Sequence, residues 1–248
     1  MIIGPRYGSE AWHAFRRGLV TASRFDDVLK NPRSKASKEA GGMSDTARSY
    51  LMELVAATIT GQDKVGGKSA AMDRGIDKEA DAIDAYCRDR FLFPSDWSEG
   101  CILRLEDTLI AATPDAFIDQ GDPEGPGILE VKCPDSKNHL DVWLSGQVPD
   151  QYVAQVLGQL EVSGRQWCDF VSFDDRFPPA MRLKVIRVYP SPLFGAESMA
   201  KIAHFADLVQ QQVDNVRSIL AQASPHEAAA VVSAMSMEED PTNLFAGL

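Results

Sequence analysis

Apolar and polar positions repeat with a helical period along several stretches of the chain. Apolar side chains that return every third or fourth residue are typical of helices that pack one face on a core. A capping Ser or Thr indicates where a helix begins, and a glycine after the last apolar position indicates where it ends. The predicted helices are Glu10–Arg17, a short one from Thr21 or Ser23 to Leu29, Ser44–Thr60, Ser69–Phe91, Ser136–Ser145, Asp150–Val162 and Pro192–Ala223.

Other stretches have the alternating or continuous apolar pattern of strands. Between two of them, Gln120 to Gly127 carries three glycines and two prolines, which favours a turn. Short loops join the first three strands, so we expect an antiparallel meander there. The combination of predicted helices and strands predicts an α/β fold with a central mixed sheet flanked by helices. The predicted strands are Cys101–Leu105, Leu109–Ile118, Ile128–Cys133, Trp167–Phe173 and Leu183–Tyr189.

Length and composition predict one globular domain over residues 1–248. The sequence has no internal repeat, and its 44% hydrophobic and 25% charged residues are ordinary for a folded protein in water. No stretch approaches the roughly 20 apolar residues of a membrane span. The N-terminus does not resemble a signal peptide. We therefore expect a cytoplasmic protein with no membrane partner.

The charge pattern narrows the kind of nucleic-acid contact that is compatible with this chain. A net charge of −11 argues against a protein that coats DNA with a basic face. The charge is uneven, however. Residues 1–40 carry eight Lys or Arg against four Asp or Glu, whereas the tail at 224–248 carries four acidic residues and no basic one. A basic N-terminal region on an acidic body is compatible with a local, enclosed phosphate site.

Candidate chemistry gathers around the strand at Ile128–Cys133. Pro114-Asp115 is followed, after fourteen residues, by Glu130-Val131-Lys132, which resembles the PD…ExK nuclease signature. Strand alternation puts Glu130 and Lys132 on one face. Two carboxylates offer oxygen ligands for Mg²⁺, and a lysine adds a cation beside a phosphate. The same residues are also compatible with a cross-strand salt bridge on a solvated sheet face.

Two predicted helices carry further polar candidates. Glu79 lies at the edge of an apolar stripe, where it is either a salt-bridge partner or a third carboxylate directed at the Asp115–Glu130 pair. Tyr152, Gln155 and Gln159 share one side of the helix Asp150–Val162. Such amides can hold a water or a phosphate oxygen, and they are equally ordinary surface glutamines.

Basic residues flank the start of the short helix near Thr21. Arg16 and Arg24 bracket its N-terminus, where free backbone N–H groups favour anions. Simple capping of the helix by Thr21 or Ser23 explains the same residues.

Six separated motifs in one order resemble the phage lambda exonuclease family, also described as YqaJ-like viral recombinases or alkaline exonucleases. The similarity extends from about Ser9 to Tyr189 and is far more specific than the PD…ExK spacing alone. The motifs lie at Glu10–Ser23, Lys30–Ser34, Arg74–Glu79, Thr113–Asp115, Glu130–Pro134 and Tyr152–Val156.

The resemblance implies a restriction-endonuclease-like core and a 5′-to-3′ exonuclease that acts on double-stranded DNA ends. It implies two Mg²⁺ ions per site, with Mn²⁺ as an alternative. The product, a 3′ single strand, is expected to pass to a single-strand annealing protein in phage-type recombination. The resemblance also implies a homotrimeric ring, in the cytoplasm of a bacterial host.

Matching positions imply metal ligands and catalytic roles. Asp115, Glu130 and the Val131 carbonyl are expected to bind metal, and Glu79 is expected to serve the second ion. Lys132 is expected to orient or activate the attacking water.

The resemblance also implies residues around the water and the DNA. Gln155 is expected to help position the water, and Tyr152 to lie near the scissile bond. The family has a second glutamine where this chain has Leu157, so Gln155 is the better candidate and Gln159 the weaker one.

A 5′-phosphate pocket is the last feature that the resemblance implies. Arg16, Ser23 and Arg33 are expected to receive the phosphate. The family arginine just after the catalytic strand is replaced here by Lys137 or Asn138, so we assign DNA contact to Lys137.

Two rival interpretations remain compatible with the sequence. The chain is another PD…ExK enzyme, such as a restriction endonuclease or junction resolvase, or it is a non-catalytic scaffold whose charged cluster is structural.

Overall fold

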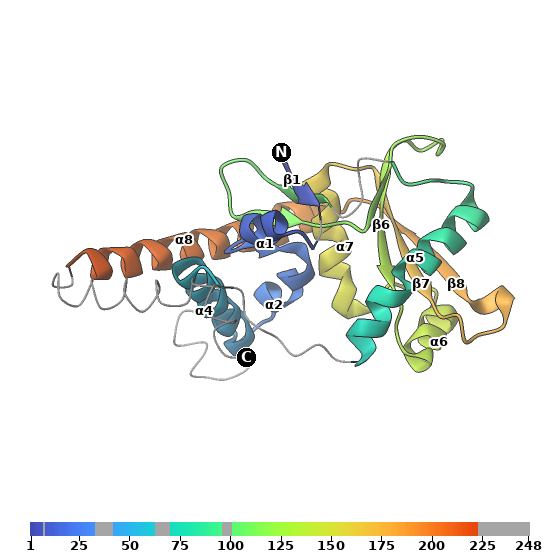
Figure 1. The fold of residues 1–248 in the computed structure, drawn as a ribbon, viewed down its shortest axis with the longest axis horizontal. Helices are drawn as coiled ribbons and strands as arrows, with labels where there is room; N and C mark the ends of the chain where they lie inside the picture. The colour runs from blue at the N-terminus through green and yellow to red at the C-terminus, as the bar shows by residue number, and fades with distance from the viewer. Residues whose placement is uncertain (7, 33–41, 63–69, 96–100, 223–248) are drawn as a thin grey trace, which may run out of the picture.

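The structure is a computed structural model that describes residues 1–6, 8–32, 42–62, 70–95 and 101–222. These residues form two four-stranded sheets and seven α-helices (Figure 1). The predicted α/β class is confirmed, although the one central sheet is divided into two. Arg33, part of the basic N-terminal region and the acidic tail lie outside the described residues.

The first sheet has the strand order β1-β3-β4-β2. Its edge strand β1 was missed by the sequence pattern, since its Ile-Ile-Gly-Pro-Arg segment lacks a period-2 repeat. Strand β2 pairs parallel to β4, and the other two pairs are antiparallel. The four strands are β1 (Ile2–Arg6), β2 (Val20–Thr21), β3 (Cys101–Arg104) and β4 (Ile110–Ala112).

The second sheet has the order β5-β6-β7-β8 and carries the candidate catalytic strand β6. Strand β6 pairs antiparallel to β5 and parallel to β7, and β7 pairs antiparallel to β8. The strands are β5 (Ala116–Ile118), β6 (Gly127–Lys132), β7 (Trp167–Phe173) and β8 (Leu183–Val188).

The predicted strand Leu109–Ile118 is wrong as one element. It is divided into β4 and β5, which belong to different sheets. Pro114 lies at the division, where it has no N–H to donate to a ladder and restricts the residue before it. The predicted meander therefore holds only for the separate antiparallel pairs β3–β4 and β5–β6. The break also places Asp115 immediately before β5, which begins at Ala116.

Two helices cover opposite faces of the second sheet. Ile128 of β6 belongs to the cluster that includes Val156 and Leu160 of α7 (Asp150–Ser163). Leu129 and Val131 belong to the cluster that includes Ala82 and Tyr86 of α5 (Ala70–Arg90). The predicted alternation along the strand is therefore confirmed.

Most of the remaining helices complete the core on the side of the first sheet, whereas α6 (Ser136–Ser145) packs on β7 of the second sheet. In Figure 1 the long helix α8 (Met199–Gln222) extends from the body, with α4 (Asp45–Thr60) packed beside it. One π-helical turn, Phe194–Ser198, precedes α8 within the predicted Pro192–Ala223 helix. The shorter helices are α1 (Glu10–Arg16), the 3-10 turn η1 (Ala22–Arg24), α2 (Phe25–Leu29) and α6 (Ser136–Ser145). No helix in the described ranges is long and apolar enough to cross a membrane.

Candidate active site

Asp115 is fixed beside β6 by two bonds to that strand. Its N–H donates to the Leu129 carbonyl at 3.0 Å, and its Oδ2 accepts the Val131 N–H at 2.6 Å. The first bond continues the β5–β6 ladder, and the second places the carboxylate against the strand. The proline break between the sheets thus leads into a rigidly held aspartate rather than a loose loop.

Glu130 is almost completely buried, with 1% exposure, and both of its oxygens have partners. Lys132 and Gln155 donate to Oε1, the latter at 2.7 Å, and Gln159 donates to Oε2 at 2.6 Å. Gln159, which the sequence ranked below Gln155, is therefore an equal partner of the carboxylate. The spacing of four residues between the two glutamines is the signal that identifies both, because it places them on one helix face.

Lys132 lies between the acids and an aromatic ring. Burial disfavours its charged form, but the Glu130 and Asp115 carboxylates outweigh burial and raise the pKa of Lys132 above the usual lysine value. Its Nζ is 5.1 Å from the centre of the Tyr152 ring, which in turn packs 5.7 Å from the Phe170 ring. The amine is therefore held as an ammonium donor.

Glu79 reaches the same cluster from α5. Burial, followed by repulsion from Glu130, raises the pKa of Glu79, and Lys132 opposes this shift. Burial and the Glu130 carboxylate also raise the pKa of Asp115 well above its usual value, and Glu79 adds to the effect. The four residues predicted from the sequence form one electrostatic unit.

The cluster holds three carboxylates against one ammonium. Its acidic side chains do not converge into a ready ligand cage, because among the described residues no three His, Cys, Asp or Glu form a group that could hold a metal ion. Glu130 is instead engaged by Lys132 and the two glutamines. The result is a partly buried acidic cluster whose charge a single lysine only partly balances.

A second polar group forms where α1 meets η1. Arg16 Nη2 donates to Thr21 Oγ1 at 3.3 Å, and the Thr21 and Ser23 hydroxyls are also 3.3 Å apart. The Thr21 N–H donates to the Tyr50 hydroxyl at 3.2 Å, and the Arg24 guanidinium lies 4.1 Å from the Tyr50 ring centre. Neither Thr21 nor Ser23 makes a side-chain cap, so the capping interpretation is wrong. Two of the three predicted phosphate residues, Arg16 and Ser23, are thus brought together.

This second group is held against α7 by close packing. The turn η1 and helix α2 pack on α7 at Gly158, which lies next to Gln159. A Cβ at Gly158 would meet the buried Phe25 ring at 2.3 Å and the Ala22 Cβ at 3.6 Å. Only glycine allows this approach, so the Arg16–Ser23 group is held at a fixed position relative to the helix that supports Glu130.

Replacing Gly158 with Ala should therefore destabilise the protein. The added methyl gains up to about 1 kcal/mol of helix propensity, but displacing a fully buried ring costs about 1–3 kcal/mol. We expect a lower urea midpoint for Gly158→Ala. Gly75→Ala in α5 is the matched control, because a Cβ there meets nothing within 4 Å, and it should raise the midpoint. A Gly158→Ala midpoint at or above that of the wild type would contradict the packing argument.

Lys137 and Asn138, which follow β6, take different positions. Lys137 is exposed in the first turn of α6. Its neighbour Asn138 lines a cavity of about 190 Å³ together with Lys132 and Tyr152. Asn138 therefore borders the candidate site, and the DNA contact of the exposed Lys137 stays a prediction.

Comparisons with known proteins give the family and the fold. Residues 11–166 match the model of the YqaJ-like viral recombinase domain. The chain is similar to two crystal structures of LHK-Exo, an alkaline exonuclease from Laribacter hongkongensis, one of them in complex with dAMP. Each superposes with a TM-score of 0.73 and 28% sequence identity. Each match covers 87% of this chain and 100% of the LHK-Exo chain.

A phage related exonuclease from Haemophilus somnus 129PT superposes with a TM-score of 0.57 and 20% sequence identity. The match covers 82% of this chain and 96% of that chain, and at this identity it supports only the similarity of fold. No curated protein sequence matches the chain. Because the family model spans more than half of the chain, the protein belongs to the family of YqaJ-like viral recombinase domains.

Proposed function

We propose that the protein is a metal-dependent exonuclease that digests double-stranded DNA from 5′ ends and leaves a 3′ single strand. The observation that carries this proposal is the grouping of Asp115, the buried Glu130 and the partly buried Lys132 around β6, with Glu79 of α5 close enough for the Glu130 carboxylate to repel it. A purely structural salt bridge needs one acid for one base. Three acids around one lysine are characteristic of a site that handles a cation or a phosphate.

Two Mg²⁺ ions, with Mn²⁺ as an alternative, suit the oxygen donors of Asp115, Glu130 and Glu79, although these described carboxylates do not form a ready ligand group without the ions. Burial and mutual repulsion raise the pKa values of Asp115 and Glu79, and a divalent cation relieves that repulsion. Asp115, Glu130 and the Val131 carbonyl would hold one ion, and Glu79 would serve the second. Such ions, when bound, activate water and neutralise charge on the phosphate.

The remaining residues position the groups that react. As an ammonium, Lys132 donates to Glu130 and is available to orient the attacking water, but it does not accept its proton. Gln155 and Gln159 fix the rotamer of Glu130 from both oxygens. Tyr152 lies beside the Lys132 ammonium, near the position proposed for the scissile bond.

The Arg16–Ser23 group is the proposed receptor of the 5′ phosphate. Arg16, Ser23 and Arg24 offer two guanidinium groups and a hydroxyl, which suit a terminal phosphate. Arg24 also forms an ion pair with Asp27 at 2.6 Å, whereas Arg16 donates to the neutral Thr21 hydroxyl. Arg16 is therefore the better candidate to bind a phosphate. Arg33 keeps its predicted role. After β6, the exposed Lys137 keeps its predicted DNA contact, with Asn138 beside the site.

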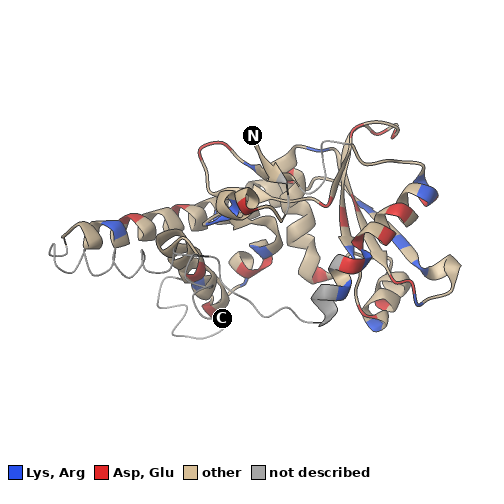
Figure 2. Cartoon of the chain, in the orientation of Figure 1, with Lys and Arg blue, Asp and Glu red and all other residues tan. Residues whose placement is uncertain are grey.

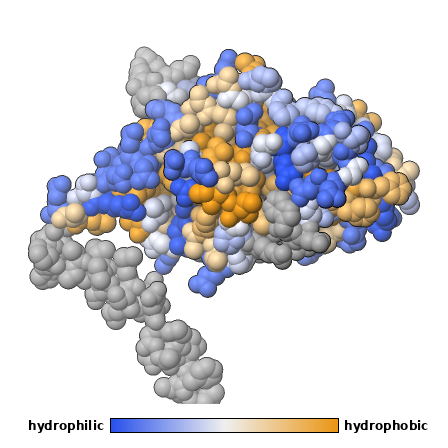
Figure 3. Space-filling model, turned by 90° about the horizontal axis from the view of Figure 1, so that it is seen from above, coloured by the Kyte–Doolittle hydropathy of each residue, from blue (hydrophilic) through white to orange (hydrophobic). Residues whose placement is uncertain are grey.

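The proposed assembly is a homotrimeric ring in a bacterial cytoplasm, with a single-strand annealing protein as partner. Basic and acidic residues alternate along α5 rather than forming a basic face (Figure 2). An enclosed DNA path suits such a surface better than an open one. Apolar residues gather in the middle of the face seen in Figure 3, with hydrophilic zones on both sides, and such apolar zones are candidate contact surfaces between chains.

Digestion of labelled duplexes tests this function. Linear duplexes carrying a label at either the 5′ or the 3′ end, and a closed circular duplex, are incubated with the protein and Mg²⁺. We expect early release of the 5′ label and an intact circle. Cutting of the circle would favour a PD…ExK endonuclease or junction resolvase, and no cutting of any substrate would favour a scaffold.

A further inference from the structure

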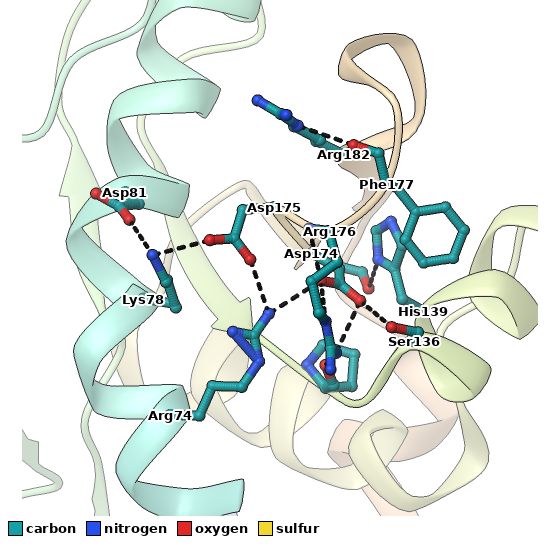
Figure 4. A network of polar contacts seen from close by, with 12 residues as sticks. Arg74, Lys78, Asp81, Ser136, His139, Asp174, Asp175, Arg176, Phe177 and Arg182 are labelled. Atoms are coloured by element: carbon teal, nitrogen blue, oxygen red, sulfur yellow. Dashed lines mark hydrogen bonds and ion pairs between the residues drawn. The ribbon is translucent and has the colours of Figure 1, made fainter.

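A second buried carboxylate, outside the proposed metal ligands, lies just past the end of β7. Asp174 has 0% exposure. Its Oδ1 accepts from Arg74 Nη2 at 2.9 Å and Arg176 Nε at 2.8 Å, and its Oδ2 accepts from the Ser136 hydroxyl at 2.7 Å. Figure 4 shows these groups converging on one carboxylate. Its partners hold the pKa of Asp174 well below the usual range, against the effect of burial.

The partners of Asp174 come from three segments that surround the candidate active site. Arg74 lies on α5, five residues before Glu79. Ser136 is the first residue of α6, four residues after Lys132. Arg176 lies in the β7–β8 connection and also donates to the Pro134 carbonyl at 3.4 Å. One carboxylate thus joins the helix that carries Glu79 to the chain that leaves the catalytic strand.

Two further ion pairs strengthen the hold on α5. Asp175 accepts from Arg74 at 3.0 Å and from Lys78 at 2.8 Å (Figure 4). Beyond Glu79, the same helix is held by the packed Ala82 and by Tyr86, whose hydroxyl donates to the buried Asp169 at 2.7 Å. Glu79 therefore lies between two anchors, an ionic one before it and a largely apolar one after it.

We infer that the Arg74–Asp174–Asp175 cluster is a positioning device that sets the place of Glu79 relative to Asp115 and Glu130. This inference rests on the proposed function. A rigid helix turns about its remaining anchor when one end is released, so loss of the cluster moves Glu79 more than it moves Tyr86. Groups that orient metal ligands typically change metal affinity by about 10–100-fold when they are removed.

Direct Mg²⁺ binding by the full chain without DNA provides the test. Calorimetry is performed on the wild type, Arg74→Ala and Asp174→Asn, and exonuclease rates are measured over a Mg²⁺ series. We expect Mg²⁺ affinity to fall by about 10-fold or more in both variants. The maximal rate should largely recover at saturating Mg²⁺. Asp119→Asn, which breaks the 2.6 Å ion pair with Arg165 elsewhere on the second sheet, should bind Mg²⁺ as the wild type does.

The outcomes separate a positioning role from a merely structural one. A lower melting temperature with unchanged Mg²⁺ affinity would overturn the inference. Arg74 is 25% exposed, so Arg74→Ala decides the question if Asp174→Asn does not fold. If the wild type itself neither binds Mg²⁺ nor needs it for cleavage, the proposed function fails, and that result is distinct from failure of the inference.

Discussion

Lys132→Ala and Asp115→Asn are each expected to lower DNA cleavage by about 10³-fold, because each removes a charged group from the buried cluster at the end of β6. Among the described residues, Lys132 is the one ammonium that donates to Glu130. Asp115 is held by the Val131 N–H, and an Asn oxygen can still accept that bond, so the variant keeps the local backbone. The rates are measured as nucleotide release from linear duplex DNA.

A matched control substitution tests whether this loss of cleavage is specific to the cluster. Lys184 lies two strands from Lys132 in the same cross-strand row, since both residues pair with Ser172 of β7. Lys184→Ala should leave the rate close to that of the wild type. Circular dichroism should show that all three variants are folded. Wild-type turnover by folded Lys132→Ala or Asp115→Asn would refute the assignment of the catalytic cluster.

Arg16→Ala is expected to reduce cleavage of 5′-phosphorylated ends by about 10–100-fold more than cleavage of 5′-hydroxyl ends. A charged hydrogen bond typically contributes about 1.5–3 kcal/mol, which corresponds to that range. The measurement compares initial rates on duplexes that differ only in the terminal group. Arg33→Ala should act in the same direction, as the sequence predicts.

Arg217 supplies the control for this second effect. It lies near the end of α8, is 60% exposed and pairs with Asp214 at 3.7 Å, so Arg217→Ala removes an arginine far from η1 in the sequence and the fold. That variant should treat both ends as the wild type does. If Arg16→Ala slows both ends equally, the group at Arg16 and Ser23 is not a phosphate receptor.

Local rules predicted the central part of the candidate site. The alternation along β6 placed Glu130 and Lys132 on the face opposite Leu129 and Val131, and the clusters on the two sides confirm it. Helical periodicity likewise placed Gln155 and Gln159 on one side of α7. These inferences succeeded because they depend on the geometry of a single strand or helix.

The same rules could not predict contacts between segments that are distant in the sequence. The apolar pattern does not show that the chain leaves one sheet at Pro114 and enters another. Nor does it show that Asp174 meets Arg74, a hundred residues earlier in the chain. The short strand β2 at Val20–Thr21 depends on its parallel partner β4 for its structure, so its own sequence carries little signal.

The most direct test of a metal-dependent nuclease site measures mononucleotide release from a 5′-phosphorylated linear duplex. The release is measured over a Mg²⁺ series, with and without a chelator. The buried acids around Lys132 predict release that rises with Mg²⁺, saturates, stops when the ion is chelated and returns when Mg²⁺ is restored. Equal release in the presence of the chelator, or none at any Mg²⁺ concentration, would contradict a metal-dependent nuclease site at Asp115, Glu130 and Glu79.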